Sequence, residues 1–234
     1  IIWYGIFFML QKYNIVTELL KKCYICVNNI DISKINYKIY IIKIIEVIVR
    51  VISGKARGTK LNSIESLSTR PTLDRVKESL FNIIQNKIPE SIVLDLFAGS
   101  GAIGIECISR GCMYAYFGEK SHEASKMIYQ NLEKTKFLNS AVVIEKDYLQ
   151  VLKMLSKEKI TFDIIYIDPP YRENLAVNAT KEILALNLLS KDGIIIIETD
   201  DEERELNKLK EIQVNVYDLR KYGRASLIFL NRKE

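Results

Sequence analysis

The chain has 234 residues, of which 27% are charged and 48% hydrophobic, with a formal net charge of +5 and a pI of about 8.8. This length and composition exclude a disordered or collagen-like chain and predict one globular α/β domain with room for an appendage. No apolar run reaches the ~18 residues of a membrane span, and the apolar first residues lack the flanks of a signal peptide. We therefore expect a cytoplasmic protein without a membrane anchor.

The cysteines predict neither a metal site nor a disulfide. Cys23 and Cys26 have CxxC spacing, but no second such pair and no histidine cluster completes a tetrahedral site, since His122 is the only histidine. Reduced thiols of a cytosolic chain are the simpler interpretation. We expect no bound metal.

The composition changes near Val49. Residues 1–48 are rich in Ile, Tyr, Asn and Lys, contain one glycine and no proline, and show no clean period. We expect them to be a dispensable N-terminal extension, either specific to a lineage or translated from upstream of the true start.

Residues 49–91 contain a cluster of positive side chains, with only two acidic residues between Gly54 and Lys77. The cluster comprises Lys55, Arg57, Lys60, Arg70, Arg75 and Lys77. It indicates a surface that binds substrate phosphates, although a merely solvated face would have the same composition.

From Ile92 onward, apolar strands alternate with amphipathic helices. The predicted strands cover residues 92–97, 114–118, 141–145, 162–168 and 193–198, and the predicted helices cover 102–110, 123–136, 149–156 and 175–189. Repeated strand–helix–strand units predict a mostly parallel, doubly wound sheet. Residues 213–219 and 225–231 predict a C-terminal antiparallel hairpin.

The first of these strands leads into a glycine-rich loop. Gly99, Gly101 and Gly104 follow the strand and open a helix, at the edge of the sheet where ligands of such folds bind. The same G-x-G-x-x-G spacing is typical of NAD-dependent oxidoreductases. The loop alone therefore predicts a nucleotide-like cofactor of either class.

Acidic residues near the strand ends distinguish the two cofactors. A carboxylate at Asp95, inside the first strand, suits the ammonium group of S-adenosylmethionine and suits a pyrophosphate badly. Glu119 ends the second strand, where it would bind a ribose, although both acids also fit ordinary turns. Asp147 follows the third strand and would meet an adenine amino group or cap the next helix.

Asp168-Pro169-Pro170-Tyr171 follows the fourth strand. The Asp168 carboxylate and the Pro169 carbonyl would accept the N–H groups of an exocyclic amine, which is a poor nucleophile because its lone pair is conjugated with the ring. The two prolines stiffen the turn, and Tyr171 offers a face on which a flipped base can stack. An ordinary strand-ending turn also uses Asp and Pro.

Four blocks together closely resemble the RsmD family of bacterial 16S ribosomal RNA guanine-N2 methyltransferases. They are residues 50–58, 70–82, 95–104 and 168–171, and the resemblance runs from about Val49 to the end. It implies a Rossmann-like class I methyltransferase fold with a seven-stranded sheet, S-adenosylmethionine as cofactor, and a guanine of 16S ribosomal RNA as target. The partner implied is that RNA, within the small ribosomal subunit or an assembly intermediate, with no obligate protein partner.

The motifs and the resemblance together give an expected site. The expected residues are Asp168, Pro169, Pro170 and Tyr171 for catalysis, Asp95, Phe97, Gly99, Gly101, Glu119 and Asp147 for the cofactor, and Lys55, Arg57, Arg70 and Arg75 for the substrate. Arg70 and Arg75 would hold RNA phosphate or help to close the site. Val76, Leu80 and Phe81 have helical spacing, which is more typical of a core.

Other functions fit parts of the pattern. A DNA adenine-N6 or cytosine-N4 methyltransferase uses the same kind of turn, but the chain has little room for a DNA-recognition domain. A non-catalytic RNA-binding protein would share the basic segment. Methyl transfer by any assay would exclude that class, and a cofactor-binding titration would separate S-adenosylmethionine from NAD.

Overall fold

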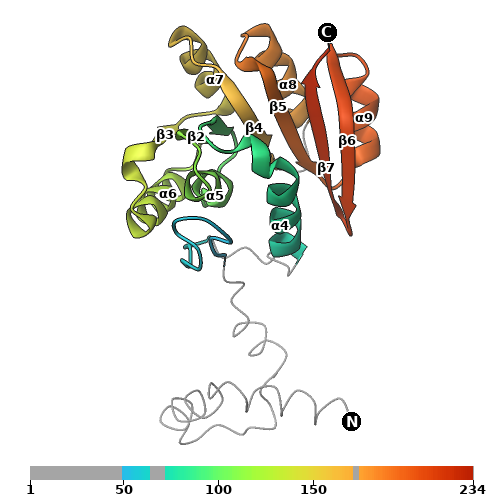
Figure 1. Ribbon diagram of the computed structural model, residues 1–234. Helices are drawn as coiled ribbons and strands as arrows, with labels where there is room; N and C mark the ends of the chain where they lie inside the picture. The colour runs from blue at the N-terminus through green and yellow to red at the C-terminus, as the bar shows by residue number, and fades with distance from the viewer. Residues whose placement is uncertain (1–48, 64–71, 171–173, 234) are drawn as a thin grey trace, which may run out of the picture. The chain divides into compact units, whose positions relative to one another are not determined.

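The computed structural model describes residues 49–63, 72–170 and 174–233 (Figure 1). The side chains of residues 72–75 are also outside the description, so Arg75 is placed only by its backbone. The expectations for residues 1–48, for Arg70 and for Tyr171 lie outside the described residues.

Seven strands of the described residues form one sheet in the order β3-β2-β1-β4-β5-β7-β6. The strands are β1 Ile92–Asp95, β2 Tyr114–Glu119, β3 Ala141–Glu145, β4 Phe162–Ile167, β5 Leu189–Thr199, β6 Val214–Tyr222 and β7 Ala225–Arg232. β1 to β5 are parallel, and β7 is antiparallel to both β5 and β6. The strand order reverses between β1 and β4, so a ligand crevice is expected at the carboxyl ends of these two strands.

Helices cover both faces of the sheet (Figure 1). The α-helices are α4 Thr72–Ile84, α5 Ala102–Ser109, α6 His122–Thr135, α7 Tyr148–Lys157, α8 Leu175–Ala185 and α9 Glu202–Leu209, and η2 Gln85–Lys87 and η3 Leu138–Ser140 are short 3-10 turns. Apolar side chains of α4, α5 and α6 pack in one core cluster, and those of α7, α8 and α9 pack in a second. The two clusters lie on opposite faces, because alternate residues of the strands belong to each.

Strand β4 shows this alternation. Ile164 and Tyr166 belong to the cluster of α4, α5 and α6, whereas Ile165 and Ile167 belong to the other cluster. All four side chains are buried. A parallel strand covered on both faces is therefore apolar on both sides, as Ile164–Ile167 are here, whereas the half-buried Asp163 near the start of β4 accepts the amide of Ile92 at 2.9 Å.

The predicted doubly wound sheet and C-terminal hairpin are confirmed, but α8, β5 and α9 differ from expectation. α8 ends at Ala185, because Leu188 donates to the carbonyl of Ile183 and Asn187 takes a left-handed φ of 53°. Leu189 then pairs with Phe162, so β5 begins four residues earlier than residues 193–198 would have it. α9 was not predicted because its exposed face is highly charged; Asp201 caps it by accepting from the amide of Arg204.

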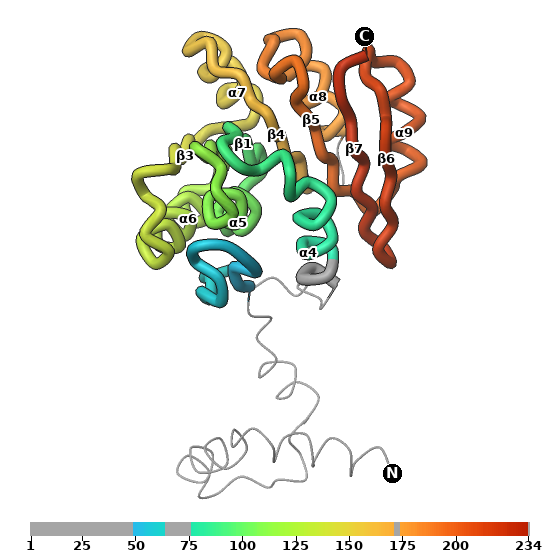
Figure 2. Tube along the Cα trace, in the orientation of Figure 1, coloured from blue at the N-terminus to red at the C-terminus, as the bar shows by residue number. Residues whose placement is uncertain are grey.

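Residues 49–63 are held against α5 by a buried carboxylate, Glu106. Its two oxygens accept the amides of Ile52 and Ser53 at 2.7 and 2.9 Å. Lys77 and Arg110 pair with the same carboxylate at 3.3 and 2.8 Å. Figure 2 shows this segment, in blue, beside α5 and α4. The assignment of Lys77 to a phosphate-binding surface was therefore wrong, because this lysine is buried at 7% exposure within the domain.

The same segment also contacts the C-terminal end of α5. Ser109 accepts the amide of Lys55 through its carbonyl at 2.8 Å and the amide of Ala56 through its hydroxyl at 3.0 Å. Gly54 lies at this contact with φ of +82°, and a Cβ placed there would be 1.8 Å from the Ser109 carbonyl oxygen. Only glycine fits this close approach of two backbones.

Replacement of Gly54 by alanine should destabilise the domain more than the same change at Gly58. Both glycines have φ near +83°, so both changes cost about 1 kcal/mol of backbone strain. Nothing lies within 4 Å of a Cβ at Gly58, whereas Gly54→Ala also breaks the contact with Ser109. We expect a loss of roughly 2–4 kcal/mol for Gly54→Ala in urea unfolding. Equal losses in the two variants would contradict the proposed backbone contact.

Candidate active site at the carboxyl edge of the sheet

The loop after β1 has the geometry of a ligand-binding turn. Gly99 and Gly101 have left-handed φ values of 53° and 76°, and Gly101 is the N-cap of α5. Nothing lies within 4 Å of a Cβ at Gly99, so the main chain there is open to a ligand. A Cβ at Gly104 would lie 2.3 Å from the Phe117 ring, so this glycine lets α5 pack closely on β2.

Asp95 is a buried carboxylate beside this loop. It is 2% exposed, and its Oδ2 accepts the amide of Gly104 at 3.2 Å. Burial raises the pKa of Asp95 to about 7; the Gly104 hydrogen bond opposes the shift and the charge of Glu119 adds to it. A ligand with an ammonium group would favour the ionised form, whereas a pyrophosphate would be repelled by it. The buried carboxylate beside this loop thus fits the ammonium group of S-adenosylmethionine.

Glu119 and Asp147 follow the next two strands at the same edge. Glu119 accepts the amides of Gly99 and Ser121 at 2.9 and 2.8 Å, so it shapes the glycine loop itself. Its oxygens each retain a lone pair with which a ribose hydroxyl can bond. Asp147 is exposed and caps α7 by accepting the amide of Leu149 at 3.0 Å. The capping alternative weighed for Asp147 is therefore present in the structure.

Phe97 lies between the loop and α7. The residue is half-buried, and its ring centroid is 5.5 Å from that of Tyr148 at an interplanar angle of 35°. The fold thus places all six residues expected to bind the cofactor at the carboxyl ends of β1, β2 and β3. They offer one buried carboxylate, two further carboxylates, open main chain and an aromatic ring.

Asn131 of α6 ties the glycine loop to the N-terminal segment, which sequence reasoning did not foresee. Its side-chain amide donates to the carbonyls of Ser100 and Asn62 at 2.9 and 3.0 Å and accepts the amide of Asn62 at 2.7 Å. Asn131 is fully buried, so its hydrogen bonds do not compete with water. The position of Ser100 therefore depends on residues 49–63.

The turn after β4 lies beside the glycine loop, because β4 pairs with β1. Pro169 is buried and Pro170 is exposed. Asp168 keeps some solvent exposure, yet enough protein surrounds its carboxyl group to raise the pKa well above the usual value, and the charges of Glu198 and Asp95 add to this effect. The described part of the predicted tetrapeptide thus adjoins the loop proposed for the cofactor.

Two further polar residues at this edge were missed from the sequence. Tyr166 of β4 is 4% exposed, and its hydroxyl donates to Glu198 Oε2. Glu198 of β5 is 5% exposed. The available signal was the position of Glu198 after four isoleucines, at the same end of its strand as Asp168. Acidic residues that end buried parallel strands lie at the ligand edge.

Lys55 and Arg57, two of the basic residues expected to bind substrate, do not lie at this edge. Lys55 and Arg57 are exposed, and the amide of Lys55 is bonded to Ser109, at the C-terminal end of α5. The glycine loop adjoins the N-terminal end of that helix, about 12 Å away for eight residues. Arg75 lies in the first turn of α4. A substrate that contacts both Lys55 and Asp168 must therefore be large.

Comparison with known proteins identifies the family. Residues 49–231 match the family model described as "Conserved hypothetical protein 95". "Putative rRNA methyltransferase YlbH" of Bacillus subtilis is 38% identical over 153 residues, which cover 65% of this chain and 83% of that protein. "Ribosomal RNA small subunit methyltransferase D" of Haemophilus influenzae is 37% identical over 156 residues, which cover 66% and 80%. The chain belongs to the RsmD family.

A solved structure agrees with this membership. A putative methyltransferase from Escherichia coli matches with a TM-score of 0.67 and 28% identity, over 79% of this chain and 97% of that one. The resemblance to the RsmD family and the Rossmann-like methyltransferase fold are thereby confirmed.

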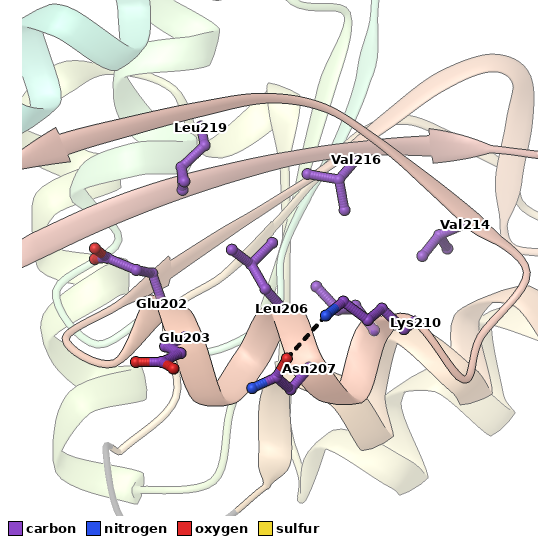
Figure 3. A pocket seen from close by; sticks show the side chains of 9 residues that line it. Glu202, Glu203, Leu206, Asn207, Lys210, Val214, Val216 and Leu219 are labelled. Atoms are coloured by element: carbon purple, nitrogen blue, oxygen red, sulfur yellow. Dashed lines mark hydrogen bonds between the residues drawn. The ribbon is translucent and has the colours of Figure 1, made fainter.

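A groove on another part of this RsmD-family chain is distinct from the candidate site (Figure 3). It lies between α9 and the edge strand β6, and contains neither Asp95 nor Asp168. Its lining residues are Glu202, Glu203, Leu206, Asn207, Leu209, Lys210, Val214, Val216 and Leu219. Nothing in this lining resembles the loop and turn at the carboxyl edge.

Among the described residues there is no metal-binding cluster and no membrane-spanning helix. No group of three or more His, Cys, Asp or Glu side chains there has an arrangement that would hold a metal ion. In the same part of the chain, no helix has the length and hydropathy needed to cross a membrane.

Asp95→Asn should change the pH dependence of stability in the cofactor-free protein. Since the pKa of Asp95 is raised from 3.8 to about 7, the native state holds a proton that the unfolded state has lost between these values, and stability falls as pH rises through them. Asparagine removes this loss. The stability of Asp95→Asn relative to the parent should rise between pH 4 and pH 8 by on the order of a few kcal/mol.

Urea unfolding across this pH range measures the effect, with the exposed Asp192→Asn as the control. A relative stability of Asp95→Asn that stays flat with pH would show that the Asp95 carboxyl is not held protonated by its surroundings.

Asn131→Ala should weaken binding of S-adenosylmethionine by roughly tenfold, because about 1.4 kcal/mol of loop positioning is lost with its hydrogen bonds. Calorimetric titration measures this. The matched control is Gln130→Ala, since Gln130 is an exposed neighbour whose side chain accepts a hydrogen bond from the Asn62 side chain at 3.3 Å. Equal affinities for the two variants would contradict the role given to Asn131.

Proposed function

We propose that this chain transfers a methyl group from S-adenosylmethionine to the exocyclic N2 of a guanine in 16S ribosomal RNA. The observation that carries the proposal is the turn of Asp168 and Pro169 at the end of β4, beside the glycine loop of β1. The names of the relatives in Haemophilus influenzae and Escherichia coli, both "Ribosomal RNA small subunit methyltransferase D", support RNA of the small subunit as substrate.

When bound, S-adenosylmethionine supplies a methyl group on a sulfonium, which is already an activated leaving group. The chain has only to hold the cofactor and the amine in line. Asp95 would hold the ammonium group, Glu119 the ribose, and the main chain of Gly99 and Gly101 would lie against the cofactor. Positioning of this kind lowers the barrier without a covalent intermediate.

Asp168 and Pro169 would orient the amine. The carboxylate accepts one N–H and the Pro169 carbonyl accepts the other, which turns the nitrogen lone pair toward the methyl group. Tyr171 would stack on the base, and Pro170 would keep the turn stiff. Because guanine N2 lies on the minor-groove edge of a pair, the base must be unpaired or flipped into the site.

The segment of residues 49–91 would contribute to RNA binding. Lys55 and Arg57 are exposed, and a loop fixed to α5 presents them. We assign phosphate contacts to these two residues and to Arg70 and Arg75. Phosphate contacts give affinity that falls with salt, and they carry no base specificity. Residues 1–48 would not be needed for this activity.

An amine of a DNA base is the second candidate, because the same turn serves adenine N6 and cytosine N4. The two candidates are separated by the labelled nucleoside. The protein is incubated with labelled S-adenosylmethionine and, separately, with small subunits lacking the methylation, naked ribosomal RNA and duplex DNA, and each product is digested. We expect N2-methylguanosine from subunits or RNA; N6-methyladenine from DNA would overturn the proposed target.

In the same assay, Asp168→Ala should lose turnover by at least 100-fold, because the amine is no longer held. Calorimetric titration should show that the variant still binds S-adenosylmethionine. Unchanged turnover would refute the role of Asp168, whereas loss of both turnover and cofactor binding would place this residue in the cofactor site instead.

A further inference from the structure

We propose that Glu198 is a positioning residue for this reaction, a second carboxylate that makes Asp168 a better acceptor of the proton that the target amine loses. The inference rests on the proposed function and extends it to a residue outside the Asp168–Tyr171 motif. It follows from the geometry of three neighbouring strands and from the proton balance of the transfer.

The sheet register brings Glu198 beside Asp168. Ile167 of β4 pairs with Ile197 of β5 in parallel register. The residues that follow them along the chain are Asp168 and Glu198. Asp168 already lies past the end of β4, whereas β5 continues through Thr199. Glu198 is therefore fixed by the sheet, while Asp168 lies in the turn that would hold the amine.

The side chain of Glu198 belongs to the same face of the sheet as Asp95 and Tyr166. Ile196, two residues before Glu198, and Val93, two residues before Asp95, both lie in the core cluster that contains Tyr166. Side chains two apart on a strand share a face. Tyr166 also pairs with Asp95 in the register of β4 and β1. Three carboxyl groups thus surround one phenol at the carboxyl edge.

Within the described part of the chain, Glu198 is held by a neutral donor and pairs with no cation. The Tyr166 hydroxyl donates to its Oε2, and none of the ion pairs among the described residues includes Glu198. A cation here would cancel its charge toward Asp168. A phenol fixes the carboxylate and leaves most of that charge in place. Burial raises the pKa of Tyr166 well above its ordinary value, so the phenol stays a donor.

The remaining groups that act on Asp168 are also acidic. The pKa of Asp168 is raised first by burial, then by the charges of Glu198 and Asp95. The pKa of Glu198 is itself raised by burial, and the hydrogen bond from Tyr166 opposes the shift. A bound proton relieves the repulsion within this group, so it favours proton uptake by Asp168.

Proton uptake by Asp168 matters because the target amine loses a proton during methyl transfer. As the bond from N2 to the methyl carbon forms, the bond from carbon to sulfur breaks and its electron pair stays on sulfur. The nitrogen then carries one proton too many, and the ionised Asp168 takes it. The charges balance, because the positive charge of the sulfonium and the negative charge of Asp168 both disappear. A more basic Asp168 takes this proton more readily.

The test is the pH dependence of single-turnover methyl transfer in Glu198→Gln. Loss of the Glu198 charge lowers the pKa of Asp168, so Asp168 stays ionised to lower pH. The acid limb of the rate profile should move to lower pH by roughly one unit, and the plateau rate should fall by roughly 3- to 10-fold as the base weakens. The exposed Glu203→Gln on α9 is the matched control and should leave the profile in place.

A second readout does not depend on turnover. Infrared titration of the cofactor-free protein follows its protonated carboxyl bands, and in Glu198→Gln the band of Asp168, assigned by its loss in Asp168→Asn, should disappear at lower pH than in the parent. Tyr166→Phe should shift both readouts in the same direction, because Glu198 without its donor is protonated more easily. This variant decides the question if Glu198→Gln does not fold.

A rate that falls in Glu198→Gln with no movement of the acid limb or of the infrared titration would show that Glu198 only supports the structure, and would overturn the inference. Failure of the proposed function is a separate result, since the parent protein itself would then form no N2-methylguanosine. The infrared titration would still report whether Glu198 acts on Asp168.

Discussion

The architecture of the site depends on the buried Glu106 of α5. This carboxylate joins Lys77 of α4, Arg110 of its own helix and two amides of the N-terminal segment. Arg110 in turn lies over the Phe81 ring at 4.7 Å. Loss of one partner would leave buried charge without compensation, which typically costs several kcal/mol. Since α5 begins at the glycine loop, this network holds one end of the helix that the glycine loop opens.

The carboxyl groups at the carboxyl edge of the sheet have different surroundings from those of Glu106. Burial raises the pKa values of Asp95, Asp168 and Glu198, and the charges of Glu198 and Asp95 raise that of Asp168 further. The hydrogen bonds described for Asp95 and Glu198 are with an amide and a phenol. Such a carboxyl group is costly to ionise when the site is empty. A cofactor with a sulfonium and an ammonium would lower that cost. The free energy of binding would thus derive in part from relief of this repulsion, which fits a site built for a cation and not for a pyrophosphate.

The sequence predicts the parts of the site that depend on neighbouring residues. Asp95, the glycines and Asp168 are recognisable because each ends or closely follows a strand, and strand ends are set by local apolar runs. Glu106 and Asn131 escape this reasoning, since their partners in the N-terminal segment are more than 50 residues away and both lie within helices of ordinary sequence. Lys77 was misassigned for the same reason. Its positive charge looks like surface until the fold brings Glu106 to it.

The structure also places the residues proposed to bind RNA apart from those proposed to carry out methyl transfer. Lys55 and Arg57 are presented at the C-terminal end of α5, whereas the loop and turn proposed for catalysis adjoin its N-terminal end. In the proposed function, contacts at the first place would neutralise phosphates, and contacts at the second would orient one base. Salt should therefore act on RNA binding far more than on the rate of the bound complex. Glu106 and Asn131 link the two places. Each bonds the segment of residues 49–63, which carries Lys55 and Arg57, to a helix that contacts the glycine loop.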